Sequence, residues 1–120
     1  MKPARPITLD ELRERLRRFA AERDWDRYHS PKNLASALIV EAAELLEHFQ
    51  WLTEAESKSL PAAELAKVRE EMADVLIYLV RLADKLEVDL LEAAREKMEK
   101  NALKYPAEKA RGNSRKNPEL

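Results

Sequence analysis

The sequence predicts an all-α protein, and three observations indicate this class. A hydrophobic fraction of 45% excludes an intrinsically disordered chain. A single Gly and an aromatic fraction of 6% argue against β-sandwiches and barrels, which need many turns. Apolar residues also recur at helical spacing through most of the chain. Because 120 residues supply one core but not two, we expect one domain over residues 1–106. Residues 107–120 should form a polar tail that is mobile or held by a neighbouring subunit.

Charge balance and the lack of cysteine exclude several function classes. The formal net charge is -1, from 22 Lys and Arg against 23 Asp and Glu, so no overall basic field attracts a nucleic-acid polymer or an anionic membrane. With no Cys there is neither a disulfide framework nor thiolate chemistry. The first residues lack the apolar segment of a signal peptide, and the longest apolar run, residues 75–80, is far shorter than the roughly 20 residues that cross a bilayer. We expect a cytoplasmic protein.

The first two helices are predicted over residues 9–23 and from Pro31 to about Trp51. Thr8 and Glu11 have the spacing of a capping box at a helix start. Ser30 is a favoured N-cap, and the proline after it suits the first helical position. Between these helices, residues 24–30 lose the helical period and mix aromatic with polar side chains, which indicates a functional loop.

Two further helices are predicted after a polar connector over residues 52–60, which can hold a helical turn of its own. Pro61 begins the third helix, which should end near Leu86. Asp89 caps the fourth helix, and Pro106 ends it. We therefore expect a bundle of four main helices, built from two antiparallel hairpins.

Four carboxylates border the apolar faces of the second and third helices. Glu41 and Glu44 lie beside a broad apolar arc, and Glu71 and Asp74 lead into residues 75–80, which we expect to be buried on every side. The predicted arc of the second helix comprises Leu34, Leu38, Ile39, Ala42, Leu45, Leu46 and Phe49. Helical spacing places each acidic pair on nearly one face, so all four carboxylates should point toward a common interior.

Carboxylates gathered in an interior repel one another unless a cation compensates them. Hard oxygen ligands favour Mg²⁺, with Mn²⁺ as the alternative, over Zn²⁺. A ferritin-like di-iron site requires Glu-x-x-His on its helices, and neither His of this chain follows a Glu at that spacing. The simpler interpretation, that these acids only decorate solvated helix faces, remains open on the pattern alone.

Several segments, in this order and spacing, resemble the MazG-like all-α nucleoside triphosphate pyrophosphohydrolases. Besides the two carboxylate pairs, these segments are RDWD (23–26), HSPKNL (29–34), ELLEHFQW (44–51), DVLIYL (74–79) and KMEKNALKYP (97–106), and they are most similar to the dCTP pyrophosphatase branch. The resemblance spans about residues 8–106. One departure is Ala43, where relatives commonly have Gly, and it leaves the carboxylates in place.

The resemblance implies a four-helix MazG-like bundle that assembles as a homotetramer, a dimer of dimers. It also implies Mg²⁺-dependent hydrolysis of a nucleoside triphosphate, dCTP or a 5-modified dCTP, to a monophosphate and pyrophosphate. The residues expected to bind the metal and carry the catalysis are Glu41, Glu44, Glu71 and Asp74. One carboxylate, Glu44 or Glu47, can instead serve as the base.

The same resemblance assigns substrate contacts outside the carboxylates. The residues implied are Trp25, Trp51 and Tyr78 around the nucleobase, His29 at the substrate, and Lys97, Asn101 and Tyr105 along one face of the fourth helix. From the residues alone, the aromatic side chains also suit a core and the polar ones a solvated face. Two other functions stay open: a non-catalytic helical dimerisation module, and a relative that acts on another nucleotide such as dUTP or a phosphoribosyl-ATP.

Overall fold

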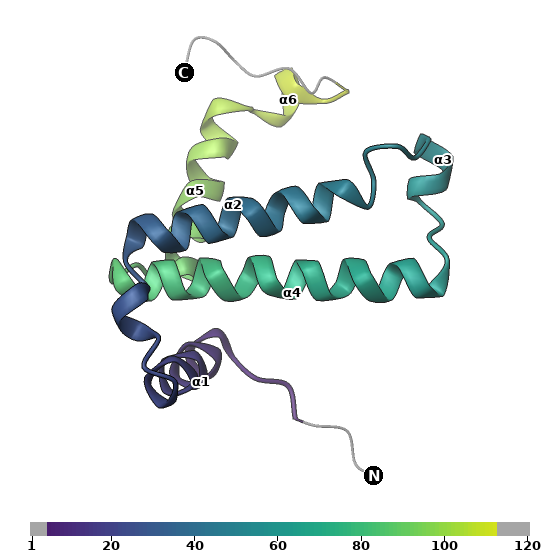
Figure 1. Cartoon of the computed structure of the whole chain (residues 1–120). Helices are drawn as coiled ribbons and strands as arrows, with labels where there is room; N and C mark the ends of the chain where they lie inside the picture. Colours follow the sequence, from purple (N-terminus) through teal and green to yellow (C-terminus); the bar gives the residue numbers. More distant parts are fainter. Residues whose placement is uncertain (1–4, 113–120) are drawn as a thin grey trace. The chain divides into compact units, whose positions relative to one another are not determined.

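The computed structural model describes residues 5–112, and within this range it contains helices and no strand. It confirms the predicted all-α class. Two compact units divide after Glu87, and each is described by itself (Figure 1). The elements of the first unit are α1 (Leu9–Glu22), the 3-10 helix η1 (Asp26–Tyr28), α2 (Pro31–Glu47), α3 (Glu54–Ser57) and α4 (Ala62–Lys85); the second unit holds α5 (Leu90–Lys104) and α6 (Ala107–Ala110).

Helix α1 begins at the predicted cap, but only half of the predicted capping box forms. The Thr8 hydroxyl accepts a hydrogen bond from the Glu11 backbone N–H at 3.1 Å. The Glu11 carboxylate does not return to Thr8; it accepts from the Arg5 guanidinium at 2.7 Å. An ion pair with Arg5 therefore replaces the hydrogen bond that the Glu11 carboxylate would accept from the Thr8 N–H in a full capping box.

The end of α1 sets the position of the loop that follows. Asp24 adopts a left-handed conformation with φ of 54°. The Trp25 N–H donates to the Ala20 carbonyl at 2.9 Å, and the Asp24 N–H donates to the Ala21 carbonyl at 3.2 Å, which is the hydrogen-bond pattern of a Schellman motif. This turn brings the Trp25 ring back onto α1, where it meets the Phe19 ring edge-on at 5.7 Å between centroids.

Helices α2 and α4 lie side by side and run antiparallel in Figure 1, connected through α3. The Ser30 hydroxyl accepts from the Asn33 N–H at 3.2 Å, and Pro31 is the first helical residue, as predicted. Helix α2 ends at Glu47, so the prediction that it reaches Trp51 is wrong, and a hydrogen-bonded turn follows it. The helical turn allowed for in the connector is confirmed as α3, with a full capping box at its start.

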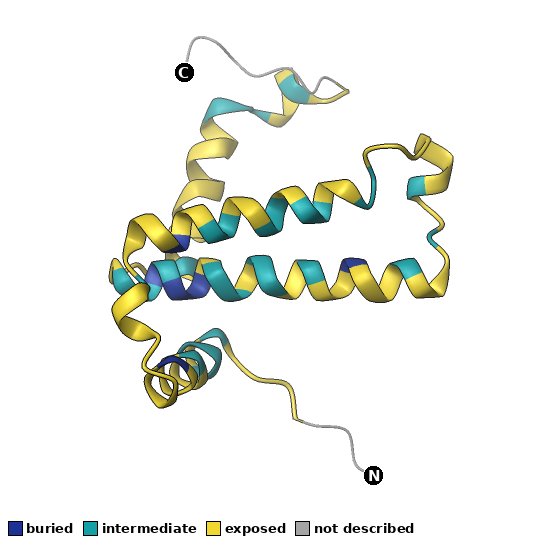
Figure 2. Cartoon of the chain, in the orientation of Figure 1, coloured by how far each residue is buried: buried dark blue, intermediate teal, exposed yellow. Residues whose placement is uncertain are grey.

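The interior of the first unit is small (Figure 2). Its buried apolar residues are Ala20, Leu34, Val68, Val80 and Ala83. The expected burial of the whole apolar arc of α2 is wrong within this chain, because Ile39 and Leu46 are 67% and 59% exposed. The expected burial of residues 75–80 on every side is also wrong, because Leu76 and Leu79 are exposed. A pair of helices covers only the facing side of each helix, so the remaining apolar side needs a further layer.

In the second unit, α5 begins at the predicted cap, where the Asp89 carboxylate accepts from the Glu92 N–H at 3.0 Å. Helix α5 ends at Lys104, just before Pro106, as expected. The expected tail starts with α6, and residues 113–120 lie outside the described part of the chain. The division into residues 1–106 and 107–120 stays a prediction. Within the described residues no helix is both long and apolar enough to span a membrane.

Candidate metal centre

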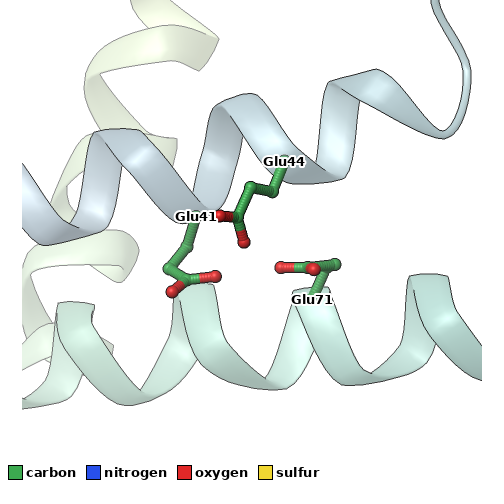
Figure 3. Close-up of side chains that lie close together, drawn as sticks. All are labelled: Glu41, Glu44 and Glu71. Atoms are coloured by element: carbon green, nitrogen blue, oxygen red, sulfur yellow. The ribbon is translucent and has the colours of Figure 1, made fainter.

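Three glutamates from the two facing helices converge. Glu41 and Glu44 come from α2 and Glu71 from α4, and one carboxylate oxygen of each lies within 4.8 Å of the others. Figure 3 shows the side chains directed toward one another across the space between the two helices. The spacing of three residues on α2 puts its two glutamates one above the other, and the pairing of α2 with α4 brings the third.

The electrostatics of this cluster are unfavourable without a cation. Burial, and next the nearby Glu71 and Glu44 carboxylates, raise the pKa of Glu41 from 4.5 to about 7. The Oε2 atoms of Glu41 and Glu71 are buried, and neither has a hydrogen-bond partner in the described chain. Buried carboxylate oxygens without a donor cost free energy. The cluster is therefore short of positive charge.

A metal ion fits this donor set. All three ligands are carboxylates, the hard oxygen donors that divalent cations such as Mg²⁺, Mn²⁺ and Ca²⁺ prefer. The two orphaned oxygens belong to opposite helices, so a cation between them would compensate both. The acidic cluster can thus hold a metal ion through Glu41, Glu44 and Glu71.

Two further acids that the sequence singled out stand apart from this cluster. Asp74 lies three residues beyond Glu71 on α4, is half-buried, and is not among the converging residues. Its charge nonetheless contributes to the raised pKa of Glu41, so it lies near that residue. Glu47 is exposed and outside the cluster. The roles of both residues stay predictions.

The aromatic residues expected around a nucleobase do not meet within one chain. Trp25 and His29 precede α2, whereas Trp51 follows it. Helix α2 has 17 residues, and at about 1.5 Å per residue its axis is roughly 25 Å long. Trp51 is 87% exposed in the turn before α3, and Tyr78 is half-buried on α4. A slot made by all three aromatic side chains is therefore not formed by this chain alone.

The remaining predicted contacts belong to the second unit. Lys97 and Asn101 are exposed on α5, as expected for one helical face. Tyr105 is the residue that caps the C-terminus of α5, and its N–H donates to the Asn101 carbonyl at 2.7 Å. Their assignment to the substrate stays a prediction.

One buried charged residue was missed by reasoning from the sequence. Arg81 of α4 is only 3% exposed and contacts Asp26 and His29 of the loop that carries Trp25. The available signal was an arginine directly after the apolar residues 75–80, at a position where a helix is buried. Its partners lie more than 50 positions away, so spacing alone does not identify them.

The fold and the site together define a class: an all-α protein whose two facing helices hold a carboxylate cluster suited to a divalent cation. Comparison with known proteins then shows the family of the chain. The sequence model of the MazG-like family matches residues 37–120. The chain belongs to the MazG-like family.

Individual relatives are similar over nearly the whole chain. The dCTP pyrophosphatase 1 of Homo sapiens is 48% identical over 115 residues, which cover 94% of this chain and 68% of that protein. The dCTP pyrophosphatase 1 of Mus musculus is 44% identical with the same coverage. Among solved structures, a pyrophosphatase from Archaeoglobus fulgidus has a TM-score of 0.79 and 44% identity, covering 88% of this chain and 99% of that one.

Proposed function

We propose that this protein is a Mg²⁺-dependent nucleotide pyrophosphohydrolase that cleaves dCTP, or a 5-modified dCTP, between the α- and β-phosphates. The products are a nucleoside monophosphate and pyrophosphate, formed with one molecule of water. The observation that carries the proposal is the convergence of Glu41, Glu44 and Glu71 with buried, unpaired oxygens. The names of the relatives in Homo sapiens and Mus musculus support dCTP as the substrate.

In this proposal Glu41, Glu44, Glu71 and Asp74 hold the metal. A bound Mg²⁺ neutralises phosphate charge, orients the triphosphate for in-line attack and lowers the pKa of water. The chain's own contribution is a fixed set of carboxylates on two rigid helices, so little reorganisation is needed when substrate arrives. Near pH 7 Glu41 keeps a proton part of the time without a cation, and a cation held by these carboxylates would displace that proton.

Two residues remain candidates for the base that accepts a proton from the attacking water. Glu44 is part of the converging cluster, whereas Glu47 is exposed one turn further along α2. A general base must lie within hydrogen-bond reach of the water it activates. The place of Glu44 within the cluster supports it over Glu47, and if Glu44 is the base, Glu41, Glu71 and Asp74 are left to hold the metal.

We propose a homo-oligomer, a tetramer built from dimers, as the active form. Large apolar side chains of α2 and α4 lie open in the single chain, among them Ile39, Leu46, Leu76 and Leu79. Exposed apolar patches of this kind mark association surfaces. The separation of Trp25 from Trp51 along α2 gives a second reason, because aromatic side chains from two copies are needed to enclose one base.

Further substrate contacts complete the proposal. Trp25, Trp51 and Tyr78 take the base, His29 contacts the nucleotide, and Lys97, Asn101 and Tyr105 contribute polar groups from α5 and its end. The nucleotide pool of the cell is the expected source of substrate, so we propose a cytoplasmic location.

The proposal is tested by incubating the purified protein with dCTP, 5-methyl-dCTP, dUTP, dTTP, dATP and dGTP, each with Mg²⁺ or with EDTA. We expect dCTP to give pyrophosphate and dCMP in the presence of Mg²⁺ and not in EDTA. The purine nucleotides should be turned over more slowly than dCTP. The Glu71→Gln variant is the control for contaminating phosphatases.

Three results would redirect the proposal. No pyrophosphate from any nucleotide would favour the non-catalytic dimerisation module. Preferential turnover of dUTP would favour the relative with another substrate. Release of orthophosphate in place of pyrophosphate would show that a different phosphate bond is cleaved.

A further inference from the structure

Arg81 is a buried cation outside the carboxylate cluster. It lies on α4 with 3% of its surface exposed, and its guanidinium reaches the loop between α1 and α2. Its Nη2 donates to Asp26 Oδ1 at 2.8 Å, and its Nη1 lies 3.5 Å from Asp84 Oδ2. A buried arginine requires partners of this kind.

The same guanidinium faces one ring nitrogen of His29. The Arg81 Nε lies 3.3 Å from His29 Nδ1, and Nη2 lies 3.2 Å from the same atom. A guanidinium has only donors, so a nitrogen that it contacts must be an acceptor. Nδ1 therefore carries no proton, and the neutral ring carries its proton on Nε2. Within residues 5–112, Nε2 makes no hydrogen bond to the protein.

The surrounding charges also disfavour a second proton on this ring. Asp26 is shared between Arg81 and Lys85, whose Nζ lies 2.6 Å from Oδ1. Asp84 is held chiefly by Arg17, whose Nε donates to Oδ2 at 2.7 Å.

Two cations, Arg81 and Lys85, and one anion, Asp26, act on the His29 ring. Burial, and next the charge of Arg81, lower the pKa of His29, while Asp26 acts in the opposite direction.

We propose that Arg81 is a positioning residue that holds His29 as its Nε2–H tautomer, so that His29 offers a fixed hydrogen-bond donor to an acceptor oxygen of the nucleotide. The nucleotide part of this inference rests on the proposed function. The Arg81–His29 part stands on the two contacts to Nδ1. Arg81 acts through His29 and touches no reacting atom.

The second histidine of the chain provides an internal reference. His48 Nδ1 lies 3.4 Å from Glu64 Oε2. A carboxylate only accepts hydrogen bonds, so this contact favours a proton on Nδ1. The two histidines are therefore expected to differ in the protonation of the same ring nitrogen.

The tautomer is measured directly by long-range ¹H–¹⁵N NMR of the histidine rings between pH 5 and 8. We expect His29 in the wild-type protein to show an unprotonated Nδ1 and a protonated Nε2 at pH 7, and His48 to show a protonated Nδ1. The His29→Gln variant assigns the signals. A protonated Nδ1 on His29 at pH 7 would overturn the proposal, and this measurement needs no other variant and no substrate.

The role of Arg81 is tested with Arg81→Met. Asp26 keeps Lys85 and Asp84 keeps Arg17 in this variant, so no buried carboxylate loses its last partner. We expect His29 to become a mixture of tautomers with a raised pKa, and the KM for dCTP to rise about three- to tenfold with kcat little changed.

Lys85→Met is the matched control. It removes one ion pair of Asp26 from the same helix but leaves both contacts from Arg81 to Nδ1, so we expect a wild-type tautomer and a KM within about twofold of wild type.

An unchanged His29 spectrum in Arg81→Met, or an unchanged KM despite an altered spectrum, would overturn the proposal. If wild-type protein cleaves no nucleotide, the proposed function and the nucleotide part fail together, while the spectra alone decide whether Arg81 fixes the ring.

Discussion

Glu41 of α2 and Glu71 of α4 face each other with one buried carboxylate oxygen apiece that accepts no hydrogen bond from the described chain. A proton or a cation between the helices stabilises such an arrangement at neutral pH. The same two residues therefore link the stability of the helix pair to the proposed chemistry. This link can be tested by measuring both turnover and thermal stability.

Removing ligand charge without removing volume should stop turnover. We expect Glu71→Gln and Asp74→Asn each to lower Mg²⁺-dependent cleavage of dCTP on the order of 100-fold or more, with an unchanged far-UV circular dichroism spectrum. Glu70→Gln is the matched control, because Glu70 is exposed on the same helix and should retain wild-type activity. Near wild-type turnover in both ligand variants would contradict the metal assignment.

The raised pKa of Glu41 predicts a pH dependence of stability in the absence of divalent cations. Between pH 4.5 and about 7 the unfolded state loses the Glu41 proton while the folded state keeps it. The contribution of Glu41 to the free energy of unfolding is therefore complete below pH 4.5 and is lost as the pH rises toward 7. His29, with a lowered pKa, changes stability with pH in the opposite direction. The contribution of Glu41 must therefore be measured as a difference between wild type and a Glu41 variant.

Glu41→Gln provides that comparison in EDTA. The difference in Tm between Glu41→Gln and wild type should increase in favour of the variant from pH 5 to pH 7.5. Adding Mg²⁺ should raise the Tm of wild type and reverse the difference. The exposed Glu47→Gln should show no such pH trend, and a wild-type Tm indifferent to Mg²⁺ would argue against a preformed site.

Trp51 is 87% exposed, so removing its side chain should weaken nucleotide binding and leave the stability of the fold unchanged. We expect Trp51→Ala to weaken dCTP binding by about 1 to 3 kcal/mol, the typical value of stacking one base on an aromatic ring, with an unchanged Tm. Trp51→Phe should restore most of the affinity, as measured by calorimetry with a non-hydrolysable dCTP analogue. Equal affinity of wild type and Trp51→Ala for every nucleotide would remove Trp51 from the site.

Lys97 is predicted to meet the triphosphate, whereas Lys100, one turn further along α5, is not. Both side chains are exposed, so neither substitution should disturb folding. We expect Lys97→Met to raise the KM for dCTP about tenfold, since a hydrogen bond from a charged donor is lost, and Lys100→Met to leave it unchanged. Equal effects of the two variants on steady-state kinetics would indicate a general charge effect only.

Glu87 adopts a left-handed backbone conformation, with φ of 55°, just after α4. This conformation is strained for residues with a Cβ atom and open to Gly. We expect Glu87→Gly to raise the free energy of unfolding by about 1 kcal/mol, measured by urea denaturation. In the middle of α4, Glu70→Gly should lower it by about 1 kcal/mol, and a loss of stability in Glu87→Gly would contradict the account.

The candidate site was only partly accessible from the sequence. The two acidic pairs were identified, and three of their four members converge. The aromatic residues were identified as a group, but their separation was not predicted. Trp25 and Trp51 lie beyond opposite ends of α2, and a resemblance names residues without giving the distance between them. The end of α2 at Glu47 was also missed, since no Gly or Pro stands there to stop the helical pattern.

The sequence by itself determined the all-α class, the start of α1, α2 and α5 at Thr8, Ser30 and Asp89, and the side of α2 and α4 that carries the three converging glutamates. These features depend on neighbours within about one turn, where capping groups and helical periodicity act.

Only the tertiary structure decided that Glu71 meets the glutamates of α2, that Arg81 reaches Asp26 and His29, and that Leu76 and Leu79 stay open in one chain. Periodicity states which residues share a face, but the free energy of burial between distant segments selects which faces pack together.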